Sequence, residues 1–139
     1  MLKEKFIERI NYRGKEFAFI VRANYPVDSI EFFSEKEDFL QVGFHNKKKG
    51  EKLKAHYHQF KNHKITSLQE VLFIVKGKVK VYFYTKKGIL IQTEVLNKGD
   101  ILFQRNLGHG FELLEDAEIF EVKQGPFFGK EHKKFFDVQ

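Results

Sequence analysis

The stretch that decides the fold is EVLFIVKGKVKVYFYT, residues 70–85, in which two apolar runs flank Lys76-Gly77-Lys78. Runs rich in Val, Ile, Phe and Tyr are typical of β-strands, and the short glycine-containing stretch between these two runs predicts a turn that separates two strands. Both runs are apolar at nearly every position. We therefore expect each strand to be buried on both faces, either by a second sheet or by another subunit.

Strand-like segments continue on both sides of these two runs. After a turn at Arg13-Gly14, alternation over 16–22 places Phe17, Phe19 and Val21 on one face. Further strands are expected at 30–33, 39–45, 53–58, 89–96, 101–104, 110–114 and 119–122. The phenylalanines expected in the core are Phe17, Phe19, Phe73, Phe83 and Phe103. Many short strands separated by turns predict an all-β fold, an antiparallel β-sandwich or barrel.

Length and composition narrow the class of protein. A chain of 139 residues is the size of one domain, so we expect a single domain over 1–139. With 42% hydrophobic and 16% aromatic residues, the chain is too apolar for a disordered protein. It has no apolar run of membrane-spanning length and no signal-peptide block, so we expect a soluble, cytoplasmic protein without a membrane partner. The absence of cysteine excludes disulfides, thiolate catalysis and zinc fingers, and leaves only nitrogen and oxygen ligands for a metal.

The net charge of +6 is concentrated in one segment. Residues 47–64 hold seven lysines and one acid, Glu51, while the rest of the chain has 18 basic and 18 acidic residues. One interpretation is a solvated lysine-rich loop. The other is that these lysines attract a small anionic ligand such as a phosphate or a sugar nucleotide. No recognition helix accompanies them, so we expect no nucleic-acid partner.

Two of the histidines are spaced for metal binding. In His56-Tyr57-His58, a strand conformation points both imidazoles to the same face, which makes half of a divalent-metal site. Such a site needs one or two further ligands from other strands. The six histidines of the chain are His45, His56, His58, His63, His109 and His132.

The residues around this pair resemble the motifs of the cupin superfamily. Its first motif, Gly-x5-His-x-His-x(3–4)-Glu-x6-Gly, is matched residue by residue by Gly50, His56, His58, Glu70 and Gly77. Its second motif is matched in part by Gly99 and His109. The resemblance covers about 40–125. It implies a jelly roll (double-stranded β-helix), with strands from 5–35 extending the sheet. It also implies that His56, His58, Glu70 and His109 bind a divalent ion: Fe, Mn, Ni or Zn.

The chain departs from the family pattern at two places. Eleven residues, 59–69, separate His58 from Glu70 where the family has three or four, so an inserted loop is expected there. In the second motif, Arg105 and Leu107 replace the usual proline and glycine, and His109 comes one residue early. The shortened 105–110 segment resembles that of small bacterial cupins associated with polysaccharide and sugar-nucleotide pathways.

Three functions remain open at this point. The first is a metal-binding cupin that acts on or binds a small oxygen-rich molecule, such as a carbohydrate or sugar nucleotide of polysaccharide biosynthesis. The second is a metal-free sugar-nucleotide ketoisomerase or epimerase, with His56 and His58 as acid and base, since histidine moves protons near neutral pH. The third is a cupin that binds a ligand without turnover. His63 and Arg105 are candidate substrate contacts in each case.

The tail, 126–139, carries four phenylalanines: Phe127, Phe128, Phe135 and Phe136. Leaving four such rings in water is unfavourable, so we expect them to pack on the barrel or on a second subunit. The sequence thus favours a homodimer.

Overall fold

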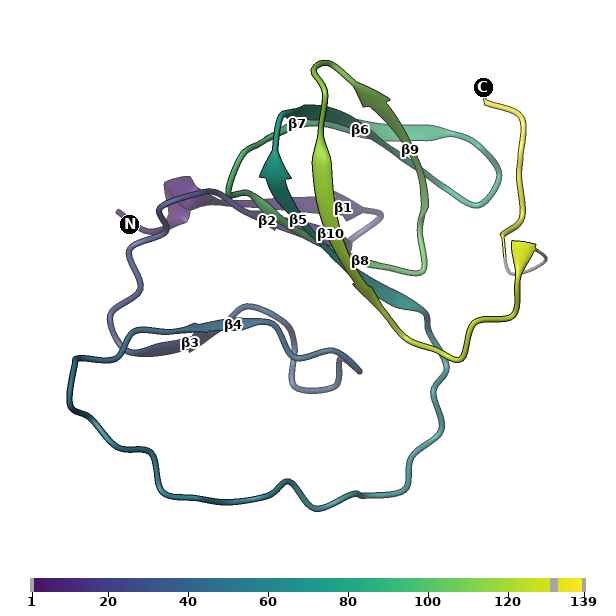
Figure 1. The fold of residues 1–139 in the computed structure, drawn as a ribbon. Helices are drawn as coiled ribbons and strands as arrows, with labels where there is room; N and C mark the ends of the chain where they lie inside the picture. Colours follow the sequence, from purple (N-terminus) through teal and green to yellow (C-terminus); the bar gives the residue numbers. More distant parts are fainter. Residues whose placement is uncertain (1, 131–132, 139) are drawn as a thin grey trace. The chain divides into compact units, whose positions relative to one another are not determined.

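The computed structural model describes residues 2–130 and 133–138, and the chain forms two compact units. Unit 1 comprises Met1–Tyr25 and Leu68–Gln139, and unit 2 comprises Pro26–Ser67. All strand pairs are antiparallel, which confirms the predicted all-β class (Figure 1). Among the described residues, no helix is long and apolar enough to cross a membrane. The single domain over 1–139 stays a prediction.

Unit 1 contains two sheets. The five-stranded sheet has the order β1-β2-β8-β5-β10, formed by β1 (Ile7–Tyr12), β2 (Lys15–Val21), β8 (Ile101–Arg105), β5 (Gln69–Lys76) and β10 (Glu118–Lys123). The three-stranded sheet has the order β7-β6-β9, formed by β7 (Leu90–Asn97), β6 (Lys78–Tyr84) and β9 (Gly108–Leu113). A short 3-10 turn, Glu4–Phe6, precedes β1.

The core of unit 1 is made of apolar side chains from both sheets, an arrangement consistent with a β-sandwich. Its buried members are Ile10, Ala18, Ile20, Leu72, Ile74, Val79, Val81, Phe83, Leu96 and Leu102. In β2 these are the even-numbered residues, whereas alternation predicted a face made by Phe17, Phe19 and Val21. Phe19 is also fully buried, with its ring stacked on that of Phe103 at 4.8 Å between centroids. The strand is therefore buried on both faces, a case in which alternation does not tell the two faces apart.

Not every predicted core residue is buried. Phe73 lies opposite Phe120 on the β5–β10 ladder, and both rings are exposed. Because β10 is an edge strand, the outer face of the sheet has fewer neighbours there.

The two predicted strands are present as β5 and β6, joined at Gly77, and they belong to different sheets, so the chain passes from one sheet to the other at this turn. This glycine has a φ of +86°, a conformation that side chains rarely adopt. A Cβ atom here would also collide with the backbone carbonyl oxygen of Asp116. The β9–β10 turn is bound to the same place, because Leu114 N–H donates to the carbonyl of Lys78 at 3.0 Å. Gly77 is therefore required both by the turn and by the backbone that packs on it.

Arg22 holds the N-terminal hairpin to the rest of unit 1. Its guanidinium donates to Asp100 at 2.8 Å, to Glu8 at 2.7 Å and to Glu94 at 3.2 Å. The Asp100 side chain is 3% exposed and also accepts from the backbone N–H of Ala23. Burial raises the pKa of Glu94, and its hydrogen bond to Glu8 adds to that effect. Burial also acts to raise the pKa of Glu8, but the hydrogen bonds from Arg22 and Glu94 outweigh it and lower the value.

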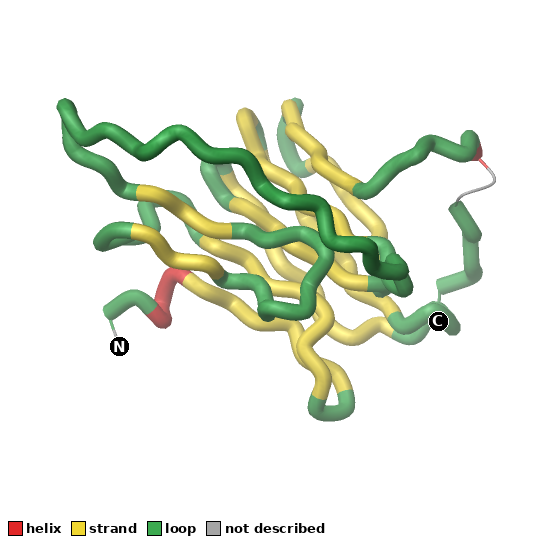
Figure 2. The backbone as a smooth tube through the Cα atoms, turned by 90° about the horizontal axis from the view of Figure 1, so that it is seen from below, coloured by secondary structure: helices red, strands yellow, loops and turns green. Residues whose placement is uncertain are grey.

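Unit 2 contains the two-stranded ladder of β3 (Ile30–Phe32) and β4 (Gly43–His45). The rest of its described chain from 46 to 67 is a continuous exposed loop (Figure 2). The strand predicted at 53–58 is wrong, since the structure assigns no strand there. A strand needs a partner that accepts its backbone hydrogen bonds, and alternation alone does not supply one.

Candidate functional site

At one end of unit 1, the rows of side chains that build the core become polar. Glu70 lies two residues before Leu72 on β5, and Gln104 lies two residues after Leu102 on β8. Leu72 and Leu102 are core residues, and successive even positions of a strand share a face. Glu70 and Gln104 are also direct neighbours in the β5–β8 ladder, so their side chains extend the inner face of the sheet.

The opposite sheet contributes an imidazole to the same end. His109 on β9 lies directly opposite Phe83 of β6, and Phe83 is part of the core. Residues that face each other in an antiparallel pair point to the same side, so His109 points inward. Its Nε2 is 3.9 Å from Oε2 of Glu70. Two of the four predicted metal ligands are therefore close together.

Gln104 completes this polar group. Its Nε2 donates to Oε2 of Glu70 at 2.6 Å, and the residue is 3% exposed. Its Oε1 is buried and accepts no hydrogen bond from any residue that the structure describes. A buried amide oxygen without a donor is unfavourable in a folded protein and calls for an explanation.

These three side chains line a cavity of about 450 Å³. Its other walls come from the residue before β5, the β6–β7 turn, the β8–β9 turn with the start of β9, and the C-terminal tail. These residues are Leu68, Lys86, Asn106, Leu107, Gly108, Lys134 and Phe136. Sites for small ligands have about 300–1,000 Å³, with mostly apolar walls and a few convergent polar groups. The cavity meets that description.

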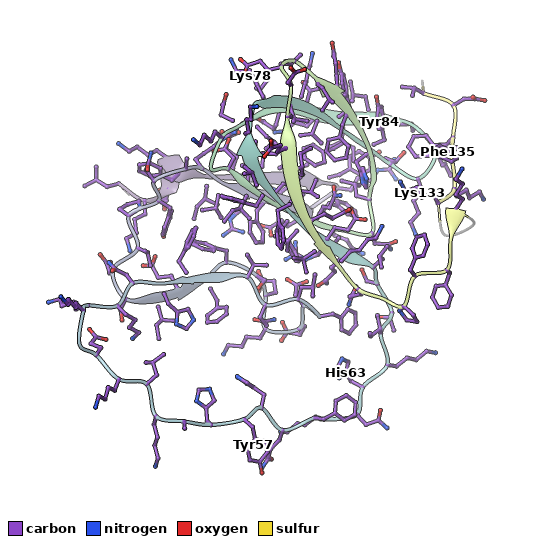
Figure 3. All side chains as sticks on the ribbon, viewed as in Figure 1. Tyr57, His63, Lys78, Tyr84, Lys133 and Phe135 are labelled. Carbon is purple, nitrogen blue, oxygen red and sulfur yellow. The ribbon has the colours of Figure 1, made fainter. Side chains whose placement is uncertain are left out.

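The tail forms one wall where the ring of Phe136 packs on the sandwich. Phe136 packs edge-to-face on Tyr84 with 5.7 Å between ring centroids. A Cβ at Gly108 would lie 2.8 Å from Cζ of Phe136, so the ring rests directly on the strand backbone. Of the four tail phenylalanines, Phe136 packs on the sandwich as predicted, whereas Phe127, Phe128 and Phe135 are largely exposed (Figure 3). The homodimer stays a prediction.

Two of the predicted metal ligands, His56 and His58, belong to unit 2, and their contacts inside that unit are as follows. His56 and His58 lie side by side, with 5.1 Å between ring centroids. Nδ1 of His56 lies 2.9 Å from the carbonyl oxygen of Lys54, and a carbonyl only accepts. Nδ1 is therefore the protonated nitrogen, and Nε2 carries the lone pair that a metal or a proton would take.

The two predicted substrate contacts, His63 and Arg105, both contact other side chains of the chain. The ring of His63, whose side chain projects from the loop in Figure 3, is stacked on Phe39 with 5.8 Å between centroids. Arg105 donates to Glu16 at 3.1 Å and lies over the ring of Phe103, and it does not line the cavity. His132 lies outside the described residues.

In unit 1, Glu70 and His109 are close enough to be two of the ligands of one metal ion. Two atoms that bind one ion at about 2.0–2.2 Å each can be no more than about 4.4 Å apart. The separation of 3.9 Å between Glu70 and His109 satisfies that limit. Among the described residues of this unit, no third His, Asp or Glu joins them as a metal-binding group. His56 and His58 as the other ligands stay a prediction.

Sequence reasoning missed Gln104 and the tail residues Lys134 and Phe136. Gln104 could have been noticed in the sequence, because it is a polar residue two positions after Leu102 and so lies on the same face of the strand. The tail residues had none, since nothing local places them beside β9. Comparisons of the chain with protein families, characterised proteins and solved structures found no match.

Proposed function

We propose that the protein binds a small oxygen-rich molecule, of the carbohydrate or sugar-nucleotide class, in the cavity of unit 1. The observation that carries this proposal is the meeting of Glu70, Gln104 and His109 from two sheets at a cavity of about 450 Å³. Inward-facing positions of a sandwich are normally apolar, and burial of polar groups is unfavourable unless they are paired. Polar groups gathered there are best explained by a polar ligand.

The walls support the same class of molecule. Leu68, Leu107 and Phe136 offer apolar surface to a carbon skeleton, while the carboxylate, amide and imidazole offer hydrogen bonds to its oxygens. A carboxylate and an imidazole in one cavity are also a pair that can move a proton between neighbouring carbons. Isomerisation or epimerisation is the reaction class that this pair would serve.

We also propose the cupin jelly roll as the fold and a divalent metal ion as the cofactor. Support comes from the motif residues and from the spacing of Glu70 and His109, which suits two ligands of one ion. A metal ion bound there would polarise an oxygen of the ligand. Glu70 would hold its carboxylate toward the ion while Gln104 donates to the same carboxylate and orients it.

Ligand binding is tested by thermal unfolding and calorimetry with UDP-glucose, dTDP-glucose, glucose and galactose. We expect at least one of them to raise the melting temperature, because a ligand that binds only the folded state stabilises it. Glu70→Gln and His109→Ala should reduce the shift. Glu112→Gln is the matched control, because Glu112 accepts from the Tyr82 hydroxyl on an exposed surface and does not line the cavity. No shift with any probe, or an equal shift in all variants, would refute the proposal.

Metal binding is tested separately by elemental analysis of the purified protein. We expect stoichiometric metal in the unmodified chain and a loss of it in His58→Ala and in His109→Ala. His45→Ala is the control, because that ring contacts Phe32 and lies outside the predicted ligand set. Substoichiometric metal in every sample would favour the metal-free acid–base alternative with His56 and His58.

A further inference from the structure

We propose that the ligand of this cavity is a hydroxylated anion, and that Gln104 is the residue that selects its hydroxyl group. This rests on the proposed function, because it names the class of molecule that the same cavity takes. The observation behind it is Gln104, a residue that lines the cavity and whose buried Oε1 has no hydrogen-bond donor among the described residues.

Glu70 fixes which way the Gln104 amide points. An ionised carboxylate only accepts hydrogen bonds, and its Oε2 lies 2.6 Å from Nε2 of Gln104. Turning the amide over would place its oxygen against that carboxylate oxygen, which is repulsive. The amide NH₂ therefore faces Glu70, and Oε1 is held as an acceptor.

An acceptor held in this way selects the chemistry of its partner. A hydroxyl of the ligand donates to Oε1, whereas an ether, ketone or carboxylate oxygen does not. A site built to bond a hydroxyl discriminates strongly against an analogue without it, because the buried polar group is then left unpaired. The ligand must therefore carry a hydroxyl at this position.

Two lysines determine the charge that we expect at the other end of the ligand. Lys86 follows β6 and Lys134 belongs to the tail, and both line the cavity. Neither forms an ion pair with a described residue, and both are exposed, so their charges lie at the mouth. Uncompensated cations at a cavity mouth attract an anionic group such as a phosphate or a carboxylate.

The experiment compares three probes by calorimetry on the full chain. Glucose 6-phosphate carries hydroxyls and a phosphate, butyl phosphate carries the phosphate alone, and glucose carries the hydroxyls alone. We expect glucose 6-phosphate to bind at least about tenfold more tightly than butyl phosphate. Glucose should bind more weakly than glucose 6-phosphate, and only the charged probes should weaken with added salt.

Substitutions test which residues cause the preference for glucose 6-phosphate over butyl phosphate. Gln104→Met keeps the length of the side chain and removes the amide, and it should bring the preference for glucose 6-phosphate over butyl phosphate close to one. Gln92→Met is the matched control, because Gln92 also donates to a carboxylate, Glu94, but does not line the cavity. The Lys86→Ala, Lys134→Ala double variant should weaken both phosphates by a similar factor and keep the preference between them.

Glu70→Gln covers the case in which Gln104→Met does not fold. With an amide in place of the carboxylate, the Gln104 amide is free to turn over, so the hydroxyl preference should fall. Equal binding of glucose 6-phosphate and butyl phosphate to the unmodified chain would overturn the inference. So would an unchanged preference in a folded Gln104→Met or in Glu70→Gln.

The two proposals fail in different ways. If an uncharged sugar binds and glucose 6-phosphate binds no more tightly than that sugar, the inference is wrong and the proposed function stands. If none of the probes binds, both are refuted.

Discussion

Replacement of Gly77 by alanine tests how the turn between β5 and β6 is packed. Two separate effects should destabilise the folded state when alanine replaces this residue. The first is the positive φ of +86°, which costs an alanine about 1–2 kcal/mol. The second is the backbone of Asp116 and Ala117, whose atoms lie within the 3.0 Å that real Cβ atoms keep clear. Because these are backbone atoms, the collision cannot be relieved by rotating a side chain.

Gly14 provides a matched control. It also has a positive φ, +75°, in the β1–β2 turn, but a Cβ there would meet nothing within 4 Å. Gly14→Ala should therefore lose about 1 kcal/mol, the φ penalty reduced by the entropy that alanine removes from the unfolded chain. Gly77→Ala should lose about 2–4 kcal/mol, since overpacking adds about 1–3 kcal/mol. The difference between the two variants isolates the collision with the β9–β10 turn.

Urea unfolding followed by circular dichroism measures this difference. With a slope of about 2 kcal/mol per molar urea, the midpoint of Gly77→Ala should lie about 1 M below that of Gly14→Ala. Equal midpoints would show that the β9–β10 turn does not pack on Gly77, and would refute the reasoning.

Two further predictions concern the Arg22 network. Arg22→Met should lose about 3–5 kcal/mol in urea unfolding, because it leaves the buried Asp100 carboxylate without its cation. Arg9→Met, which breaks an exposed ion pair, should lose about 0–1 kcal/mol, and similar losses in both would contradict this. Because the pKa of Glu94 is raised above 4.5 in the folded chain, the folded state keeps a proton that the unfolded state has released. The free energy of unfolding should therefore fall, relative to that of Glu94→Gln, as the pH rises from about 4.5 through the raised value; a difference that is independent of pH would argue against it.

Much of the strand layout could be predicted because strand signals are local. The two strands joined at Gly77 and the strands at 101–104 and 119–122 appear within a residue of their expected bounds. The strand at 53–58 was predicted from the same kind of alternation and is absent. Alternation reports that a segment could pair, whereas pairing depends on a partner far away in the sequence.

The same distinction applies to the site. Glu70 and His109 were predicted from motif spacing, and the ladders bring them to 3.9 Å, whereas His56 and His58 as their co-ligands remain a prediction. Gln104 was missed although it continues the row of Leu102, because the sequence does not show that its ladder partner is Glu70.

The sequence by itself determined the all-β class, the turns and the residues able to carry chemistry, because strand periodicity and turn propensity are properties of neighbouring residues. Only the tertiary structure decided which polar positions face inward together, which way the Gln104 amide is held, and that the tail lines the cavity beside β9. These depend on contacts between segments far apart in the sequence, such as the hydrogen bond between Gln104 and Glu70, and no local pattern encodes them.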